Sequence, residues 1–246
     1  MPPSRRPPAV PAFRPPSPPA LLLLSLFLLL PALAPGAARA QSLADIAKQA
    51  QTAHLGIFNK TEVKAGPIGP LPKWLGVLEK MKAQKEMLKR CAAQLPSCDP
   101  ADAKPWREVE AEAASLEPMA RLKAVNAFFN KWPYKTDLDN YGVDDYWATP
   151  VEFMTRSGDC EDYAIAKFYA LLQLGVPNDD MRIVAIMDHI RNIGHAVLVV
   201  RIGNDSVVLD NLSNLVMSHT RYPQYDPQFS VNETTRWMHI GTIATK

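Results

Sequence analysis

A single cysteine lies among carboxylates in the segment SGDCEDYA, residues 157–164. Cys160 follows Asp159 and precedes Glu161 and Asp162. A thiol becomes a strong nucleophile by losing its proton, and neighbouring carboxylates oppose that loss because they raise the thiol pKa. The segment therefore holds a candidate nucleophile in a setting that disfavours it, unless a positive charge balances the acids.

The same residues predict the start of a helix. Asp159 is a favourable N-cap, which makes Cys160 the first helical residue, and Gly175 and Pro177 are stop signals at the other end. The unpaired N–H groups and the positive end of the helix dipole favour a thiolate at that position. Acids also begin ordinary helices, and a cysteine can be a simple packing residue, so this segment alone does not separate catalysis from structure.

Residues downstream supply a candidate base and a candidate orienting group. His195 opens a predicted strand over residues 195–203, and Asp210 closes the next predicted strand, over 206–212. The turn GND joins the two strands into a hairpin, which places the start of the first strand beside the end of the second. With Cys160, these residues form a set of nucleophile, general base and base-orienting carboxylate.

Four other histidines compete for the role of base, namely His54, His189, His219 and His239. His189 is the strongest of them, but it ends a predicted strand and is followed by the loop IRNIG. His195 begins a strand beside a glycine that gives access to its ring. We therefore favour His195 as the base.

Helical spacing in the first part of the chain gives way to β-branched runs in the second. Helices are expected over residues 43–53 and 74–95, over two segments between 105 and 131 with a break near Pro118, and from Cys160 onward. Strands are expected over 182–188, 195–203, 206–212 and 234–241. This order predicts an α+β fold, with a helical part over about 43–175 and an antiparallel sheet over about 181–241.

The first forty residues are typical of a secretory signal peptide. They contain no acidic residue, and they begin with a part that carries Arg5, Arg6 and Arg14, followed by the apolar run ALLLLSLFLLLPAL and then by ARA at residues 38–40. The uninterrupted apolar part is too short for a membrane anchor, which needs roughly 20 residues. We expect cleavage before Gln41, which leaves residues 41–246 as one mature domain.

The charge of the mature part excludes some classes of function. Removal of residues 1–40, with four arginines and no acids, changes the formal charge from +2 to −2. A near-neutral chain gives no electrostatic argument for nucleic-acid binding, and no second apolar run is long enough to span a membrane. We expect a soluble exported protein in an oxidising compartment, the periplasm or the exterior.

The cysteines are Cys91, Cys98 and Cys160. In the segment RCAAQLPSCDP, Pro96 and Pro100 break the preceding helix and can fold the chain back into a short Cys91–Cys98 disulfide loop. Two free buried thiols are the alternative, and a metal pair is disfavoured because no histidine lies within 30 residues. Cys160 is then an unpaired thiol in an oxidising compartment, which requires a functional reason.

Four stretches carry a resemblance to a known family. YGVDDYWATPVEF, GDCEDYAIAK, GHAVLVV and VVLDNL together resemble the bacterial transglutaminase-like cysteine peptidases, most closely the LapG-type periplasmic proteases. The resemblance covers most of the mature chain, including the Cys91/Cys98 pair. It implies a transglutaminase-like, papain-related fold with Cys160 as nucleophile, His195 as general base and Asp210 as the orienting residue.

The resemblance also implies a substrate, a metal and a partner. It implies an endopeptidase that cleaves a large surface adhesin near its N-terminus, at a site containing two alanines. Cleavage would release the adhesin from the outer membrane and so control biofilm attachment. The resemblance further implies Ca²⁺ beside the cysteine, and an inner-membrane cyclic-di-GMP receptor that sequesters the protease.

Calcium would balance the acids around Cys160. Ca²⁺ takes about six to eight oxygen ligands, and Asp159 and Asp162, followed by Glu161, are the favoured candidates. The loop PNDD beyond the helix offers Asp179 and Asp180 as weaker candidates, if the following strand returns beside the cysteine turn. Mg²⁺ fits less well because it keeps its waters and needs stricter geometry.

Two other classes of function stay open from the sequence. An acyl transferase or cell-wall amidase could use the same three residues, and a binding module could keep the fold without the chemistry. All three candidate positions are present, which counts against the binding module. An amine-acceptor assay separates a transferase from a protease.

Overall fold

The computed structural model describes residues 56–66, 68–69, 71–92 and 100–241. Its helices are α2 (Pro72–Ala92), α3 (Pro100–Ala113), α4 (Pro118–Phe129), α5 (Asp137–Tyr141), α6 (Pro150–Arg156) and α7 (Cys160–Gln173). Its strands are β1 (Thr61–Lys64), β2 (Met181–Asp188), β3 (Ile193–Ile202), β4 (Asp205–Asp210), β5 (Ser213–Ser218), β6 (Tyr225–Val231) and β7 (Arg236–Ile240). Short 3₁₀ helices are η1 (Ile57–Asn59), η2 (Asn178–Asp180) and η3 (His219–Arg221).

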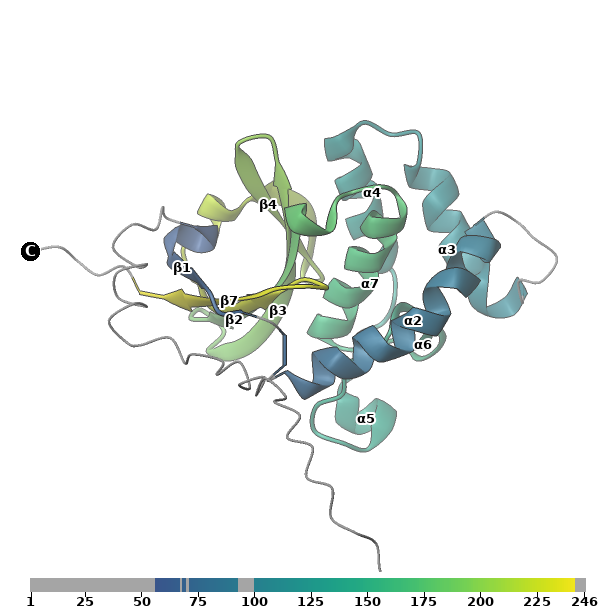
Figure 1. Ribbon diagram of the computed structural model, residues 1–246, viewed down its shortest axis with the longest axis horizontal. Coiled ribbons are helices and arrows are strands. Elements are labelled where there is room, and N and C mark those ends of the chain that lie inside the picture. Colours follow the sequence, from purple (N-terminus) through teal and green to yellow (C-terminus); the bar gives the residue numbers. More distant parts are fainter. Residues whose placement is uncertain (1–55, 67, 70, 93–99, 242–246) are drawn as a thin grey trace, which may run out of the picture. The chain divides into compact units, whose positions relative to one another are not determined.

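The strands form one antiparallel sheet in the order β1-β7-β6-β2-β3-β4-β5. β1 pairs with β7, so segments from the two ends of the described chain lie side by side (Figure 1). In the centre, β2 pairs with β3 in a register that places His195 opposite Ile186. β4 returns beside β3 through a tight turn at Gly203, whose φ of 59° suits glycine.

Helix α7 packs on the sheet and is covered by other helices. It contacts β2, β3 and β4 on one side and α3, α4 and α6 on the other (Figure 1). Every residue from Asp162 to Leu171 is buried, as expected for a helix inside a core. Since α7 is held on all sides, its first residue is held in a fixed position relative to the sheet.

Side chains of the central strands alternate between two cores. On β3, Leu198 and Val200 join the core shared with α7, while Val197 and Val199 join a smaller core on the opposite face. Aromatic side chains from η1, from the segment before β6 and from the first residue of β6 complete the smaller core. Burial on both faces explains why β2, β3 and β4 read as nearly continuous apolar runs.

The α+β class is confirmed, and most predicted elements lie within a few residues of the observed ones. The sequence does not predict β1, β5 or β6. β1 has four residues, and β6 contains Pro227 and pairs with β2 through a register shift, features that hide a strand from pattern recognition. The sheet therefore includes a strand, β1, that precedes the helices in the sequence.

Three predictions lie outside the described residues and stay predictions. They concern the signal segment 1–40, the helix over 43–53 and the Cys91–Cys98 pairing. Within the described ranges, no helix combines the length and the apolar character needed to cross a membrane.

Candidate active site

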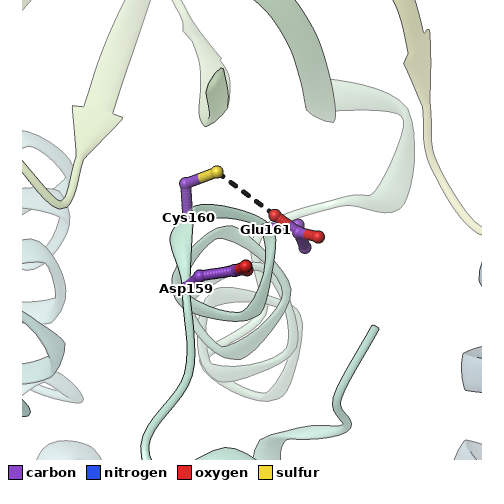
Figure 2. A group of neighbouring side chains, drawn as sticks. All are labelled: Asp159, Cys160 and Glu161. Carbon is purple, nitrogen blue, oxygen red and sulfur yellow. Dashed lines mark hydrogen bonds between the residues drawn. The ribbon is translucent and has the colours of Figure 1, made fainter. Parts of the chain in front are cut away.

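Cys160 is the first residue of α7 and Asp159 is its N-cap, which confirms the predicted helix start. Just before them, Gly158 forms a parallel bridge with Tyr134, which brings the segment before α5 alongside the cysteine. The thiol is partly buried and donates a hydrogen bond to Oε2 of Glu161 at 3.2 Å (Figure 2). The candidate nucleophile thus lies at the N-terminal end of a buried helix, in contact with one of its acidic neighbours.

His195 and Asp210 meet at one end of the β3–β4 pair, as the predicted hairpin requires. Both are buried, and His195 Nε2 lies 2.9 Å from Asp210 Oδ1. The carboxylate also accepts hydrogen bonds from the Tyr225 hydroxyl at 2.6 Å and from the Leu212 backbone N–H at 3.0 Å. Because Nε2 faces the carboxylate, Nδ1 is the ring nitrogen left for a second partner.

Cys160 and His195 line one cavity of about 430 Å³. A hydrogen bond from the backbone N–H of Ala196, the residue after His195, lowers the pKa of the Cys160 thiol, against the larger effects of burial and the acids. The thiol therefore lies beside the first part of β3. The other lining residues are Asn130, Trp132, Tyr134, Tyr163, Arg191, Ile193, Gly194, Asn211 and Leu212. A thiol and an imidazole therefore open onto the same cavity, with a carboxylate directly behind the imidazole.

The competing histidines that the structure describes lie away from this cavity. His189 is exposed and faces Asp226, with Nε2 3.5 Å from Oδ2. His219 accepts a hydrogen bond from the backbone of η1, and His239 is buried 2.9 Å from the Ser230 hydroxyl. His54 lies outside the described residues. Among the described histidines, the geometry therefore supports His195 as the base.

Five carboxylates gather at the start of α7. The ligand atoms of Asp137, Asp159 and Asp162 lie within 4.8 Å of one another, and so do those of Asp137, Asp145 and Glu161. Asp159, Cys160 and Glu161 form a third group of this kind, and Figure 2 shows all three at the end of the helix. The cluster therefore joins the cysteine turn to α5 and the loop that follows α5.

Burial makes these carboxylates hard to ionise together. Burial, with the neighbouring acids, raises the pKa of Asp159 to about 9 and the pKa of Asp162 to about 8. Burial also raises the pKa values of Asp137 and Glu161. For Cys160, burial and then the charges of Glu161 and Asp159 raise the thiol pKa well above its ordinary value. The protein groups alone therefore disfavour the thiolate, as the sequence suggests.

The donor set suits a hard divalent cation. Oδ1 of Asp137 and Oδ1 of Asp159 are buried without a hydrogen-bond partner among the described residues. The Asp162 carboxylate is fixed by the backbone N–H of Ala148 at 2.6 Å and that of Asp159 at 3.3 Å. Ca²⁺ prefers such carboxylate oxygens, and a cation here would satisfy the buried oxygens and relieve the repulsion among them.

Asp179 does not belong to this cluster, which corrects the expectation from the sequence. It lies in η2, beyond the far end of the 14-residue helix α7, and at about 1.5 Å per residue that end is roughly 20 Å from Cys160. Asp180 beside it forms an ion pair with Arg201 instead. Strand β2 runs from η2 toward the cysteine, so its end returns to the site but its beginning does not.

Asp137 and Asp145 are the candidate ligands that the sequence does not single out. Their signal is the acid-rich segment TDLDNYGVDD, in which Thr136 caps α5 and Gly142 ends it with a φ of 71°. Local patterns predict such a turn, but its contact with the start of α7 is a tertiary one. Only the folded chain shows that these acids face Asp159 and Glu161.

A cysteine at the start of a buried helix, packed on an antiparallel sheet that brings a histidine and an aspartate to the same site, is the arrangement expected of a cysteine hydrolase. The chain belongs to the bacterial transglutaminase-like cysteine proteinase (BTLCP) family, whose model matches residues 80–244. No match is found among curated proteins.

Solved structures of one protein, LapG of Legionella pneumophila, are similar to this chain. One is 29% identical over 65% of this chain and 87% of that chain, with a TM-score of 0.51. An EGTA-treated form is 29% identical over 65% of this chain and 84% of that chain, with a TM-score of 0.51. The calcium-bound form is 27% identical over 69% of this chain and 93% of that chain, with a TM-score of 0.52.

Proposed function

We propose that the protein is a calcium-dependent cysteine endopeptidase of the periplasm. Cys160 is the nucleophile, His195 the general base and Asp210 the residue that orients the base. The observation that carries this proposal is the single cavity lined by Cys160 and His195, with Asp210 Oδ1 2.9 Å from the imidazole. Membership of a cysteine proteinase family supports peptide hydrolysis as the reaction.

The chemistry follows from which ring nitrogen is free. Asp210 holds Nε2, so Nδ1 of His195 takes the proton of the Cys160 thiol. The thiolate attacks the scissile carbonyl carbon, and backbone N–H groups, that of Cys160 among them, stabilise the oxyanion. The amine leaves with the proton from the imidazolium, and a water molecule deprotonated by His195 then hydrolyses the thioester.

Calcium is the cation we propose for the acidic cluster. Its candidate ligands are Asp137, Asp145, Asp159, Glu161 and Asp162. The calcium-bound and EGTA-treated forms of Legionella pneumophila LapG support this choice of metal. When bound, the cation supplies positive charge that offsets the carboxylates beside Cys160.

The substrate we propose is a large surface adhesin, cleaved near its N-terminus at a site containing two alanines. Its release from the outer membrane would end biofilm attachment. An inner-membrane cyclic-di-GMP receptor is the proposed partner that sequesters the enzyme. The similarity to LapG supports these assignments, and the expected signal peptide would deliver the chain to the compartment in which such partners meet.

Incubation of residues 41–246 with an N-terminal adhesin fragment from the same genome, in Ca²⁺, tests the function. We expect a single cut, identified by sequencing the new termini, and no cut with Cys160→Ala. Addition of a primary amine should leave the products as free acids, because a protease transfers the acyl group to water. Incorporated amine would favour the acyl transferase, and cleavage by Cys160→Ala would refute a cysteine protease.

A further inference from the structure

Among the residues that line the cavity of Cys160 and His195, Arg191 carries a permanent charge and no assigned role. We propose that Arg191 binds an acidic side chain of the substrate close to the scissile bond. This inference rests on the proposed proteolysis and adds a substrate feature to it. Arg191 would then determine specificity, as a residue that touches the substrate and not the reacting atoms.

The position of Arg191 is set by its turn. Arg191 lies between β2 and β3, where Oδ1 of Asp188 accepts hydrogen bonds from the backbone N–H groups of Ile190 at 3.0 Å and Arg191 at 3.3 Å. Asp188 is itself buried. The buried carboxylate therefore holds the turn in place, and the turn carries Arg191 to the wall of the cavity, four residues before His195.

The guanidinium of Arg191 is available for a ligand. Its side chain makes no hydrogen bond or ion pair that the structure records with any described residue, and the residue is exposed. By contrast, Arg182 pairs with Glu62 at 2.6 Å and Arg201 pairs with Asp180. A guanidinium presents several N–H donors in a planar fork that matches a carboxylate.

The surroundings make this cation selective. Burial and the charges of Cys160, Asp159 and Glu161 raise the pKa of Tyr134, which lines the same cavity, and the charge of Arg191 opposes that rise. A substrate carboxylate near the acidic cluster would be repelled, and Arg191 offers the position where it is attracted. A basic substrate side chain at the same place would meet like charge, which rejects it.

The apolar rim indicates that the carboxylate belongs to a peptide and not to a small anion. Tyr134, Ile193 and Leu212 line the cavity with 55%, 42% and 47% of their surfaces exposed. Ile190, next to Arg191, is 78% exposed. Large apolar side chains gathered at a cavity mouth mark a binding surface, and an extended peptide would place its own apolar groups on them.

Alkylation of Cys160 tests the anion site without any peptide substrate. Iodoacetate carries a carboxylate and iodoacetamide does not, so the ratio of their rates at Cys160, measured on the tryptic peptide in saturating Ca²⁺, reports the local attraction for an anion. Arg191→Gln should lower this ratio by about three- to tenfold, and Arg191→Lys should restore part of it. Arg201→Gln, at the other end of β3, is the control. An unchanged ratio in Arg191→Gln would overturn the proposal.

A peptide library cleaved by the mature protein tests specificity itself. We expect Asp or Glu to be enriched at one fixed position near the cut, and the kcat/KM ratio of acidic to neutral peptides to fall about tenfold in Arg191→Gln, the equivalent of roughly 1.4 kcal/mol. Arg191→Glu should favour Lys or Arg at that position. Cleavage with no charge preference would refute the role of Arg191, whereas the absence of any cleavage would count against the proposed proteolysis.

Discussion

The Asp210 carboxylate accepts three hydrogen bonds at the candidate site. Burial alone would raise its pKa, yet the hydrogen bonds from His195, Leu212 and Tyr225 hold the pKa below its ordinary value. The group therefore remains a carboxylate through the working pH range and keeps the His195 proton on Nε2. The sequence predicts His195 and Asp210, because the ends of a hairpin must meet, but it does not predict Tyr225, which arrives from a strand that it misses.

Removal of the Asp210 charge should leave the fold but reverse the preferred tautomer of His195. We expect Asp210→Asn to lower kcat/KM by roughly 10³- to 10⁴-fold. Tyr225→Phe removes one of three hydrogen bonds and should cost about tenfold. The matched control is Tyr222→Phe, since the Tyr222 hydroxyl is buried without a hydrogen-bond partner among the described residues. Equal effects of the two tyrosine variants would contradict the role of Tyr225.

Lys167 is a buried lysine on α7 that the proposed mechanism does not use. It is 1% exposed and lies over the Tyr163 ring at 5.7 Å, and burial lowers its pKa to about 7, against a smaller opposing effect of Asp210. Because the folded-state pKa is depressed, the unfolded chain binds more protons between about pH 7 and 10.5. Because of Lys167, the free energy of unfolding therefore rises with pH across that window, and it falls again as the pH is lowered to 7.

Lys167→Met should consequently be more stable than the parent protein at pH 7. The difference should shrink by about 1.4 kcal/mol for each pH unit between 7 and 9. Urea denaturation at fixed calcium concentration measures it, and Lys123→Met, on the exposed face of α4, is the control. A variant that is less stable than the parent at pH 7 would show instead that Lys167 is charged and stabilised in the fold.

At the scale of elements, the start of α7 is well predicted and its surroundings are not. Capping and stop residues around Cys160 give the helix, because these signals are local. The approach of α5, with Asp137, to the same point depends on tertiary packing, as does the distance of Asp179 from it. Residue type therefore suggests the metal from the sequence, while the set of ligands follows only from the fold.

The ligand set can be tested by thermal stability, without any substrate. Ca²⁺ at 100 times Kd should stabilise the parent protein by about 2.7 kcal/mol, which raises Tm by roughly 5–10 °C. Asp137→Asn should lose most of this shift, because an amide replaces a charged ligand. Asp179→Asn should keep all of it. Equal shifts in both variants would contradict the cluster.

Gly158 leaves room for the Asp162 carboxylate beside the turn that precedes Cys160. A Cβ at this position would lie 2.0 Å from Oδ2 and 2.7 Å from Cγ of Asp162, whose carboxylate is already fixed by backbone N–H groups. Gly158→Ala should therefore displace Asp162 and weaken Ca²⁺ binding at least tenfold, about 1.4 kcal/mol. Titration calorimetry measures this.

The matched control for that variant is Gly76→Ala on α2, where a Cβ would meet no atom within 4 Å. This change should leave Ca²⁺ binding intact and stabilise the helix by up to about 1 kcal/mol. Unchanged calcium affinity in Gly158→Ala would show that the turn can relax without moving a ligand.

At the scale of the whole molecule, the class of fold follows from the sequence because helical and β-branched patterns occupy separate parts of the chain. The sheet order does not follow, since β1 and β7 pair across nearly the whole described length. Export and the Cys91–Cys98 disulfide stay predictions. They bear on function, because a disulfide between those two residues would make Cys160 the sole free thiol of the mature chain.

The central claim is that the Cys160 thiol, activated by His195, performs the cleavage. The most direct measurement is to alkylate residues 41–246 to increasing extents in Ca²⁺, quantify modification of Cys160 by mass spectrometry, and assay cleavage of the adhesin fragment in each sample. We predict that activity falls in proportion to the modified fraction of Cys160 and reaches zero at one alkyl group per chain. We also predict that His195→Ala slows the alkylation, because the thiolate is then less available. Cleavage that persists when Cys160 is fully alkylated would contradict the account.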